Sequence, residues 1–326
     1  MPPDMTENSA SLTGTAAIED VLRAELAQGD AQIASIGPIL RHLLANDEHS
    51  VFGDEIIARV RAMLADLVRQ LLDALDVARE DGEVREHDPA LIDAMVESLA
   101  AHGSFLNHAH ALALEWQLTE RLQARLALDP VVSPLLQALI ASGESNTAAA
   151  AMALLAQQAR FAQNQRRMQL PLAELPGDLF HAALIALQTH AQHDPESQGI
   201  AAQAVHSVRH GFDESRSRLG LIARLVAGMG GGASAALNVS HAGVSIFLSA
   251  LALASGHDRD LAVLSTNEGQ VARFALALRA AGLWPQAIEE QFAALHPEIA
   301  LPSGFEQMGS DRAAALLAHS VAYPAA

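Results

Sequence analysis

The amino-acid sequence predicts an all-α protein, and three observations lead to this prediction. Half of its 326 residues are hydrophobic, which is enough for a substantial core. Only 4% are aromatic, and the apolar residues are mostly Ala, Leu, Ile and Val, of which Ala and Leu favour helices. Clusters of β-branched residues between turn residues, which would indicate strands, are scarce.

We expect the chain to have three parts. Residues 1–14 lack the basic and apolar stretches of a signal peptide and are expected to form a disordered tail. Residues 15–129 are expected to form a helical bundle domain, and residues 130–326 a repeat-like helical domain. In the bundle domain, Thr15–Asn46 carries two short amphipathic segments, which the Gly37-Pro38 pair is expected to interrupt.

The rest of the bundle domain predicts two long helices joined through a short one. The first covers Ser50–Ala78, the short helix starts at Asp88-Pro89, and the second long helix covers Ser104–Leu128. This order indicates an antiparallel hairpin, which is half of a four-helix bundle. The first long helix has a wide apolar stripe, which predicts a homodimer whose interface uses both Ser50–Ala78 and Ser104–Leu128. The stripe includes Val60, Leu64, Leu67, Leu71 and Leu75.

Beyond Pro130 the sequence alternates short Ala/Leu helices with turns of small residues. Three stretches echo one another: "LLQALIASGESNTAAAAMALLA", "FLSALALASGHDRDLAVLSTNE" and "FALALRAAGLWPQAIEEQF". Each reads as a helix, a turn with glycine and a second helix. A recurring helical hairpin is typical of stacked arrays, so we expect an irregular α-solenoid, with an irregular helical domain as the alternative.

The stretch "VAGMGGGASAALNVSHAGVSIF" resembles a phosphate-binding loop only in its glycines. A P-loop needs a lysine and a dinucleotide fingerprint needs a preceding strand, whereas this chain has no lysine and the glycines follow a helix-like segment. We therefore expect Gly228–Gly232 to lie in a loop between helices without an anion. Ser240 is expected to cap a helix that starts near His241.

Charge and composition exclude several classes of function. The net charge of −18 disfavours nucleic acids and anionic membranes as partners, and all 20 basic residues are arginine. The absence of cysteine excludes disulfides and thiolate chemistry. The least charged stretch, residues 225–256, is too interrupted to span a membrane. We expect a cytoplasmic protein that carries no cofactor.

The histidines are the main candidates for chemistry. His108 or His110 on the second long helix could accept a phosphoryl group, by analogy with helical phosphotransfer domains. His206 and His210 have the spacing of a metal-binding pair, but Ser207 stands where a zincin has glutamate. No Glu-x-x-His motif occurs on the long helices, so satisfied or solvent-facing histidines are the favoured interpretation.

Two stretches resemble a family of uncharacterised bacterial all-helical proteins, known as a domain of unknown function. They are "SPLLQALIASGESNTAAAAMALLAQQARFAQNQRRMQLPLAELPGDLFHAALIAL" and "FALALRAAGLWPQAIEEQFAALHPE", which contains a turn of the "LALRAAGL" type. The resemblance is strongest over the carboxy-terminal two thirds. It implies a helical fold in a bacterial cytoplasm, and it implies no activity and no functional residues.

The sequence favours a non-enzymatic protein-interaction scaffold or regulatory adaptor, because no coherent catalytic constellation is present. The alternatives are the phosphotransfer module and a metal or small-ligand sensor that uses the histidines. The partner is expected to be a neutral or basic protein bound along polar residues beside the turns of the clearest hairpins. These residues are Asp258, Arg259, Asp260, Glu268, Arg273, Glu289 and Glu290.

Overall fold

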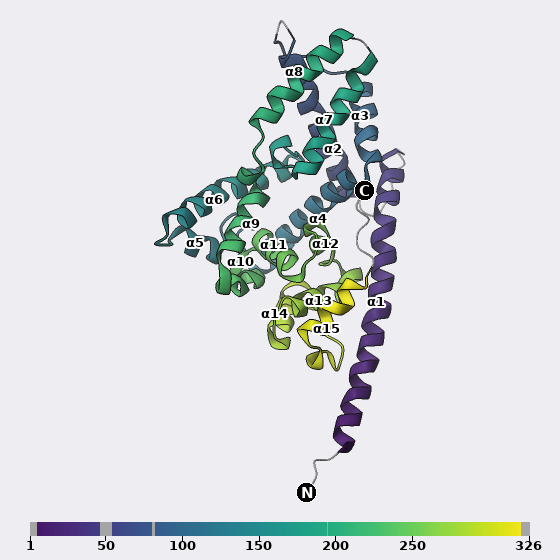
Figure 1. Ribbon diagram of the computed structural model, residues 1–326, viewed down its shortest axis with the longest axis vertical. Coiled ribbons are helices and arrows are strands. Elements are labelled where there is room, and N and C mark those ends of the chain that lie inside the picture. The colour runs from purple at the N-terminus through teal and green to yellow at the C-terminus, as the bar shows by residue number, and fades with distance from the viewer. Residues whose placement is uncertain (1–4, 46–53, 80–81, 194, 321–326) are drawn as a thin grey trace. The chain divides into compact units, whose positions relative to one another are not determined.

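The computed structural model describes residues 5–45, 54–79, 82–193 and 195–320, and it confirms the all-α class (Figure 1). These residues form α-helices and short 3-10 turns, and no strand occurs among them. None of the helices in this part of the chain is long and apolar enough to cross a membrane.

The chain divides into two compact units, and each unit is discontinuous in sequence. Unit 1 takes residues from 1–36, 117–143 and 225–325, and unit 2 takes residues from 37–116 and 144–224. This division differs from the expected split at residue 129, because both units draw on residues before and after it. The dimeric bundle and the solenoid arrangement stay predictions.

Three helices contribute residues to both units, and the remaining helices belong mostly to one. The shared helices are α1 (Met5–Ala45), α4 (Gly103–Leu126) and α9 (Arg218–Gly228). Unit 2 also contains α2 (Asp54–Val77), α3 (Pro89–Ala101), α6 (Ser145–Arg166), α7 (Gly177–His190) and α8 (Pro195–Gly211). Unit 1 also contains α5 (Pro134–Ile140), α10 (Val239–Ala242), α11 (Val244–Ser255), α12 (Arg259–Leu264), α13 (Val271–Ala280), α14 (Pro285–Leu295) and α15 (Ser310–Ala318).

The first helix corrects two expectations. It begins at Met5, inside the segment 1–14 that was expected to be disordered, and it continues through Pro38 instead of ending at the Gly37-Pro38 pair. Proline removes one backbone donor and costs a helix interior about 3 kcal/mol. Beyond the proline, the Arg41 guanidinium donates to the Ala100 and Ala101 carbonyls of α3 at 3.3 Å each, which holds this end of α1 on α3.

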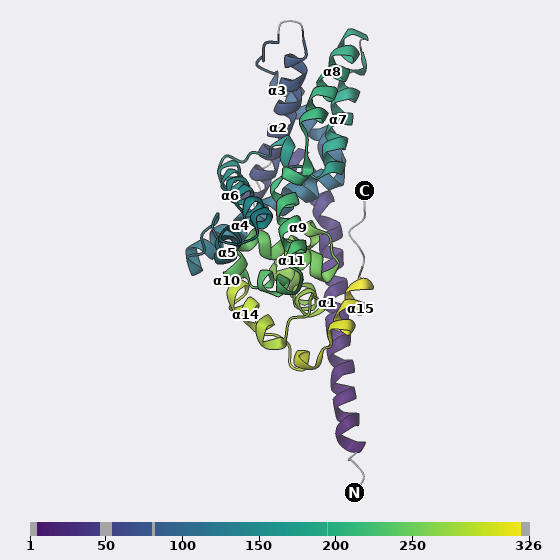
Figure 2. The same ribbon diagram turned by 60° about the vertical axis from the view of Figure 1, so that its left-hand side comes forward.

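The leucine stripe of α2 is covered within a single chain. Leu64, Leu67 and Leu71 are completely buried. The helices α3, α7 and α8 pack on α2, and both ribbon views draw these four helices side by side (Figure 2). The prediction that a second copy covers this stripe is therefore wrong, since no exposed leucine surface remains there. Ser50, the expected first residue of this helix, lies outside the described residues.

Unit 2 is organised around a completely buried ion pair. The Arg218 guanidinium donates to both carboxylate oxygens of Glu115, at 2.6 and 3.1 Å, and the two side chains are 2% and 0% exposed. The Cζ atom of Arg218 lies 3.6 Å from the centroid of the Phe161 ring. The backbone N–H of Arg218 donates to Glu174 at 3.0 Å. These contacts join α4, α6, the turn before α7 and the start of α9.

Unit 1 has an equivalent centre at Arg273. Its guanidinium pairs with Asp30 of α1 and donates to the Ser320 hydroxyl at 3.1 Å, and the residue is 1% exposed. The neighbouring Gln270 donates to the Gly29 carbonyl at 2.9 Å. A Cβ at position 29 would lie 2.6 Å from the amide oxygen of Gln270, so a larger residue there would displace this side chain.

The recurring turn of the sequence appears in two hairpins of unit 1. Gly256 between α11 and α12 and Gly282 between α13 and α14 both have positive φ, at 71° and 91°. At each turn an N–H beyond the glycine bonds back to a carbonyl in the last turn of the preceding helix, as in a Schellman motif. Gly143, in the first of the three echoing stretches, is not among the positive-φ residues, so that turn has a different geometry.

The glycine run is more ordered than a loop. Gly228 ends α9, and Gly230–Leu237 forms a 3-10 helix, so the expected loop over Gly228–Gly232 is corrected. The cap of the next helix is also different from the expected Ser240. Asn238 accepts a hydrogen bond from the His241 backbone N–H at 3.1 Å.

We expect Arg218→Met to lower the free energy of unfolding of unit 2 by about 3–5 kcal/mol, because it leaves the Glu115 carboxylate buried without its cation. Combining it with Glu115→Gln should restore part of the loss. Denaturant unfolding followed by Trp116 fluorescence measures this in a Trp284→Phe background, since the chain has two tryptophans. Exposed Arg209→Ala is the control, expected within about 0.5 kcal/mol.

Gly230→Ala should destabilise the protein by about 1 kcal/mol, because φ is 51° at this glycine. Gly231→Ala and Gly232→Ala should change stability by less than about 1 kcal/mol, since φ is ordinary and the added methyl groups meet open space. Thermal unfolding of the three variants tests the difference. A nucleotide that stabilises the parent protein but not these variants would contradict the interpretation.

Candidate functional site

The most exposed large apolar side chain in the described part of the chain is Trp284. It is 75% exposed and lies in unit 1, at the N-cap of α14. A tryptophan costs free energy when it is left in water, and it is among the residue types that dominate protein-binding surfaces. No local pattern in the sequence indicates this exposure, because an apolar residue between two Ala/Leu helices is usually part of a core.

The backbone that carries Trp284 is firmly held. Gly282 ends α13 in a left-handed conformation, and the Leu283 N–H donates to the Leu278 carbonyl at 3.2 Å. The Arg279 guanidinium donates to the Leu283 carbonyl at 3.0 Å. Pro285 then starts α14 with its φ already fixed. The indole therefore projects from an ordered turn, which lowers the entropy cost of binding through it.

The helix that follows Trp284 has one buried and one acidic face. Ile288 and Phe292 are buried in the core of unit 1, and the Phe292 ring lies 5.3 Å from that of Phe274. Glu289 and Glu290 are exposed on the other face, as expected of a binding rim. Because the opposite face of α14 is buried in the core, Glu289 and Glu290 have a fixed orientation one to two helical turns from the indole.

The predicted rim residues at the start of α12 make local contacts around the turn that precedes this helix. The Asp258 carboxylate is exposed and accepts from the Asp260 N–H at 2.8 Å, which makes it the N-cap of the helix. Arg259 is half-buried and donates to the Ser249 hydroxyl at 2.9 Å. Asp260 is half-buried as well. These three residues lie together on one helical turn.

Two predicted rim residues have other surroundings. Arg273 is buried in the ion pair with Asp30, so its assignment to an exposed rim is wrong. Arginine keeps its charge when it is desolvated beside a carboxylate, which sequence patterns do not reveal. Glu268 is exposed, and its charge opposes the lowering of the pKa that burial causes in Arg121 and His296.

The structure argues against His108 as the phosphoryl acceptor of the phosphotransfer hypothesis. His108 is 2% exposed within α4, so a partner domain cannot reach its ring. His110 is half-buried on the same helix. An acceptor histidine must meet the phosphate of another protein in solvent, and the burial of His108 removes this possibility.

The histidine pair of α8 has no metal-site geometry around it. His206 and His210 are both exposed. Over the described ranges, no group of three or more His, Cys, Asp or Glu residues is arranged to hold a metal ion.

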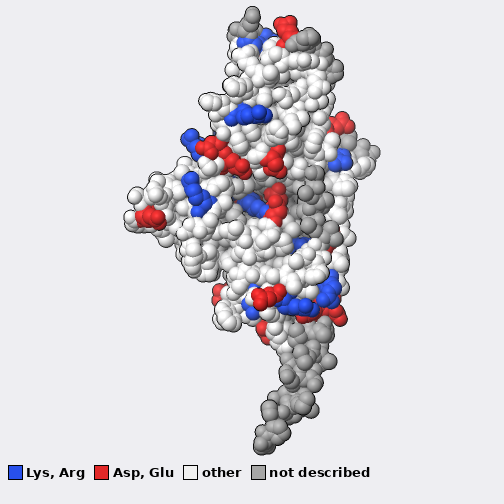
Figure 3. Space-filling view, in the orientation of Figure 1, with Lys and Arg blue, Asp and Glu red and all other residues white. Residues whose placement is uncertain are grey.

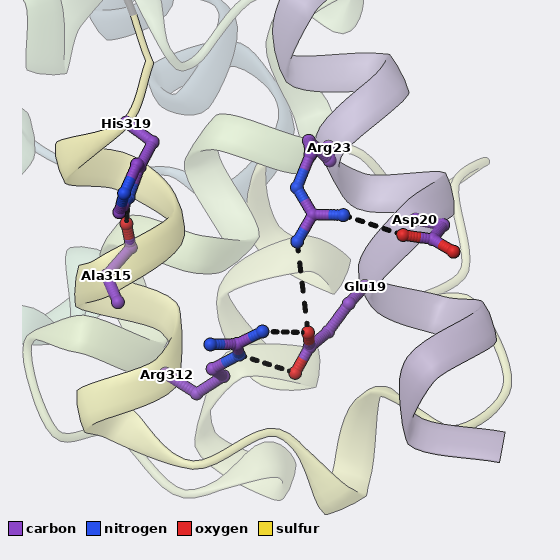
Figure 4. Close-up of polar contacts among 6 residues, drawn as sticks. All are labelled: Glu19, Asp20, Arg23, Arg312, Ala315 and His319. Carbon is purple, nitrogen blue, oxygen red and sulfur yellow. Dashed lines mark hydrogen bonds and ion pairs between the residues drawn. The ribbon is translucent and has the colours of Figure 1, made fainter. Parts of the chain in front are cut away.

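A cleft of about 320 Å³ separates α1 and α15 in unit 1, and charged residues surround it. Figure 4 shows Glu19 between Arg23 and Arg312. Arg312 donates to both carboxylate oxygens of Glu19, with an Nε–Oε1 distance of 2.6 Å, and this hydrogen bonding lowers the pKa of Glu19. Arg23 donates to Asp20 at 2.6 Å. Since these cations are paired with carboxylates of α1, the cluster joins the two helices and is a poor anion site.

The face drawn in Figure 3 shows small groups of both charge signs, separated by uncharged surface. The net charge of −18 therefore does not form one broad acidic field on this face.

Comparison with models of protein families, with curated proteins and with solved structures found no match to this chain. The resemblance to an uncharacterised bacterial helical family therefore stays a prediction.

A buried and a half-buried histidine make the stability of unit 1 depend on pH. His296 is 4% exposed between Phe274 and Phe292, and its pKa is lowered by burial and then by the charge of Arg121. Burial and Arg273 lower the pKa of His257 in the same direction. Because the folded pKa is below the unfolded one, their contribution is present above about pH 6.5 and is lost as the pH falls.

We expect His296→Gln to reduce the loss of stability between pH 7.5 and pH 5.5, because the variant removes a group that the unfolded chain protonates first. Denaturant unfolding at a series of pH values measures the slope. Exposed His206→Gln is the matched control and should keep the parent slope. An unchanged slope in His296→Gln would show that this imidazole is not held neutral by the fold.

Proposed function

We propose that the protein is a non-enzymatic interaction scaffold or adaptor that binds a protein partner through the turn between α13 and α14. The observation that carries the proposal is Trp284, an indole that is 75% exposed on an ordered turn. Rigid aromatic side chains provide a large contact area at low entropic cost, and they are enriched among the residues that dominate binding energy.

The neighbouring acidic face supports a partner that is basic or neutral. Glu289 and Glu290 are exposed on α14, the helix that Trp284 precedes. Charges beside an aromatic anchor mainly set specificity and the association rate, whereas the anchor provides the affinity. We therefore assign the binding energy to the indole and the choice of partner to the two glutamates.

Three earlier expectations stay predictions beside this proposal. They are the bacterial helical family, the cytoplasmic location and the homodimer. The homodimer needs a surface other than the leucine stripe of α2, because Leu64, Leu67 and Leu71 are covered within one chain.

The test compares partner capture by the parent protein and by three variants, using cells that make the protein. Trp284→Ala should reduce capture by roughly tenfold or more, since a dominant interface residue contributes at least about 2 kcal/mol. Charge reversal at Glu289 and Glu290 should also weaken capture. The control is Leu253→Ala on α11, whose side chain is 60% exposed and which should bind like the parent.

A purified partner then allows a direct measurement. In a Trp116→Phe background, Trp284 is the only tryptophan, and its emission should shift to shorter wavelength when the partner covers it. The capture variants should keep the parent melting temperature, because the side chains that they change are exposed. Full capture by Trp284→Ala would refute the proposal. A fall in melting temperature with unchanged capture would show that Glu289 and Glu290 stabilise the fold instead.

A further inference from the structure

The indole of Trp284 has no large apolar neighbour on the exposed surface of its own hairpin. It is 75% exposed, and no second large apolar side chain is exposed on α13 or α14. A binding surface that works by apolar burial usually forms a wider apolar patch around its anchor. Recognition at Trp284 therefore depends on the aromatic ring itself more than on a continuous apolar surface.

The stretch of chain around Trp284 carries only acidic charge. No arginine or lysine occurs between Arg279 and Arg312, and the carboxylates in this stretch are all exposed. These residues are Glu289, Glu290, Glu298, Glu306 and Asp311. The one histidine of the stretch, His296, is buried and its pKa is lowered by burial, so it adds no positive charge at neutral pH. The stretch is therefore complementary in charge to a cation.

The arginine that is nearest to Trp284 in the sequence is held by the backbone. The half-buried Arg279 guanidinium donates through Nε to the Met308 carbonyl at 2.5 Å and through Nη1 to the Leu283 carbonyl at 3.0 Å. These two hydrogen bonds keep the guanidinium against main-chain oxygens. Arg279 therefore orders the turn and leaves the indole to a partner.

Other aromatic rings of the protein already bind a guanidinium. The Cζ atom of Arg218 lies 3.6 Å from the ring centroid of Phe161, and that of Arg166 lies 5.9 Å from the ring centroid of Trp116. Among the residues that the structure describes, no guanidinium lies over Trp284 in this way. Its ring is thus an exposed π surface in an acidic part of unit 1, and its own chain provides no cation for it.

We propose, on the basis of the function proposed above, that Trp284 binds an arginine side chain in a basic segment of the partner protein. The guanidinium would stack on the indole, which among aromatic side chains attracts cations most strongly. Arginine fits better than lysine, because its guanidinium is planar and weakly hydrated. Glu289 and Glu290 would attract the basic segment to the turn. The same carboxylates repel nucleic acids, which are the other common ligands of exposed aromatic rings.

The test uses the full-length protein and an acetylated, amidated peptide of sequence Gly-Arg-Gly-Arg-Gly as the probe. The matched peptide has citrulline, which is neutral and similar in shape, at both arginine positions. With ¹⁵N-labelled tryptophan the protein gives two indole signals, and Trp284→Leu identifies the signal of Trp284. The arginine peptide should shift this signal in a saturable way and leave that of buried Trp116 in place. The citrulline peptide should bind at least roughly fivefold more weakly.

Variants separate the local site from the net charge of the protein. Glu289→Gln combined with Glu290→Gln should weaken binding of the arginine peptide roughly threefold or more, as expected for two exposed charge pairs. Glu97→Gln combined with Glu196→Gln removes the same charge from exposed positions of unit 2, and this control should bind like the parent. Trp284→Leu keeps an apolar side chain without a π surface. It should lose binding, which the line widths of the peptide's own NMR signals measure.

Equal binding of the citrulline and arginine peptides would overturn the assignment, because the indole would then make an apolar contact without recognising a cation. Equal loss of binding in the two double variants would overturn it too, since the net charge alone would then attract the peptide. Melting temperatures equal to that of the parent ensure that the comparison concerns binding.

The outcome also separates this assignment from the function on which it rests. If Trp284→Ala loses partner capture while the arginine peptide leaves the Trp284 signal unshifted, the turn binds its partner through another group and only the arginine assignment is wrong. Full capture by Trp284→Ala would contradict both.

Discussion

A guanidinium that leaves water must be given a carboxylate, and each unit of this protein is arranged around one such pair. Arg218 with Glu115 organises unit 2, and Arg273 with Asp30 organises unit 1. An unpaired charge at either place would cost several kcal/mol, so the helices can approach only in the register that closes the pair. The ordered Trp284 turn lies on a core that is fixed in this way.

Local features of the fold could be predicted from the sequence, and pairings across the chain could not. The class, the Asp88 cap of α3 and the glycine turns all follow from short-range chemistry. The burial of the α2 leucines was predicted correctly and assigned to the wrong partner, because α7 and α8 follow about 100 residues later in the chain. The ion pair of Arg218 joins residues 103 positions apart, and no local pattern marks such a pair.

In the candidate sites as well, local features could be predicted from the sequence and contacts across the chain could not. Exposed Glu289 and Glu290 were predicted, because polar residues on an amphipathic helix face water. Trp284 was missed, because an indole among Ala/Leu helices suggests a core. Only the three-dimensional structure shows that Trp284 is in water and that Arg273, which was expected at the rim, is buried against Asp30.

During synthesis, α1 is made long before the parts of unit 1 that it contacts. Gly29 and Gln270 are separated by 241 residues, and Glu19 and Arg312 by 293. The buried positions Ile18, Leu22 and Leu26 therefore leave the ribosome long before the helices that cover them. Throughout that interval the apolar face of α1 is available to chaperones or to other nascent chains. Closure of unit 1 is accordingly a late event in synthesis, and it has the slow kinetics of contacts between distant residues.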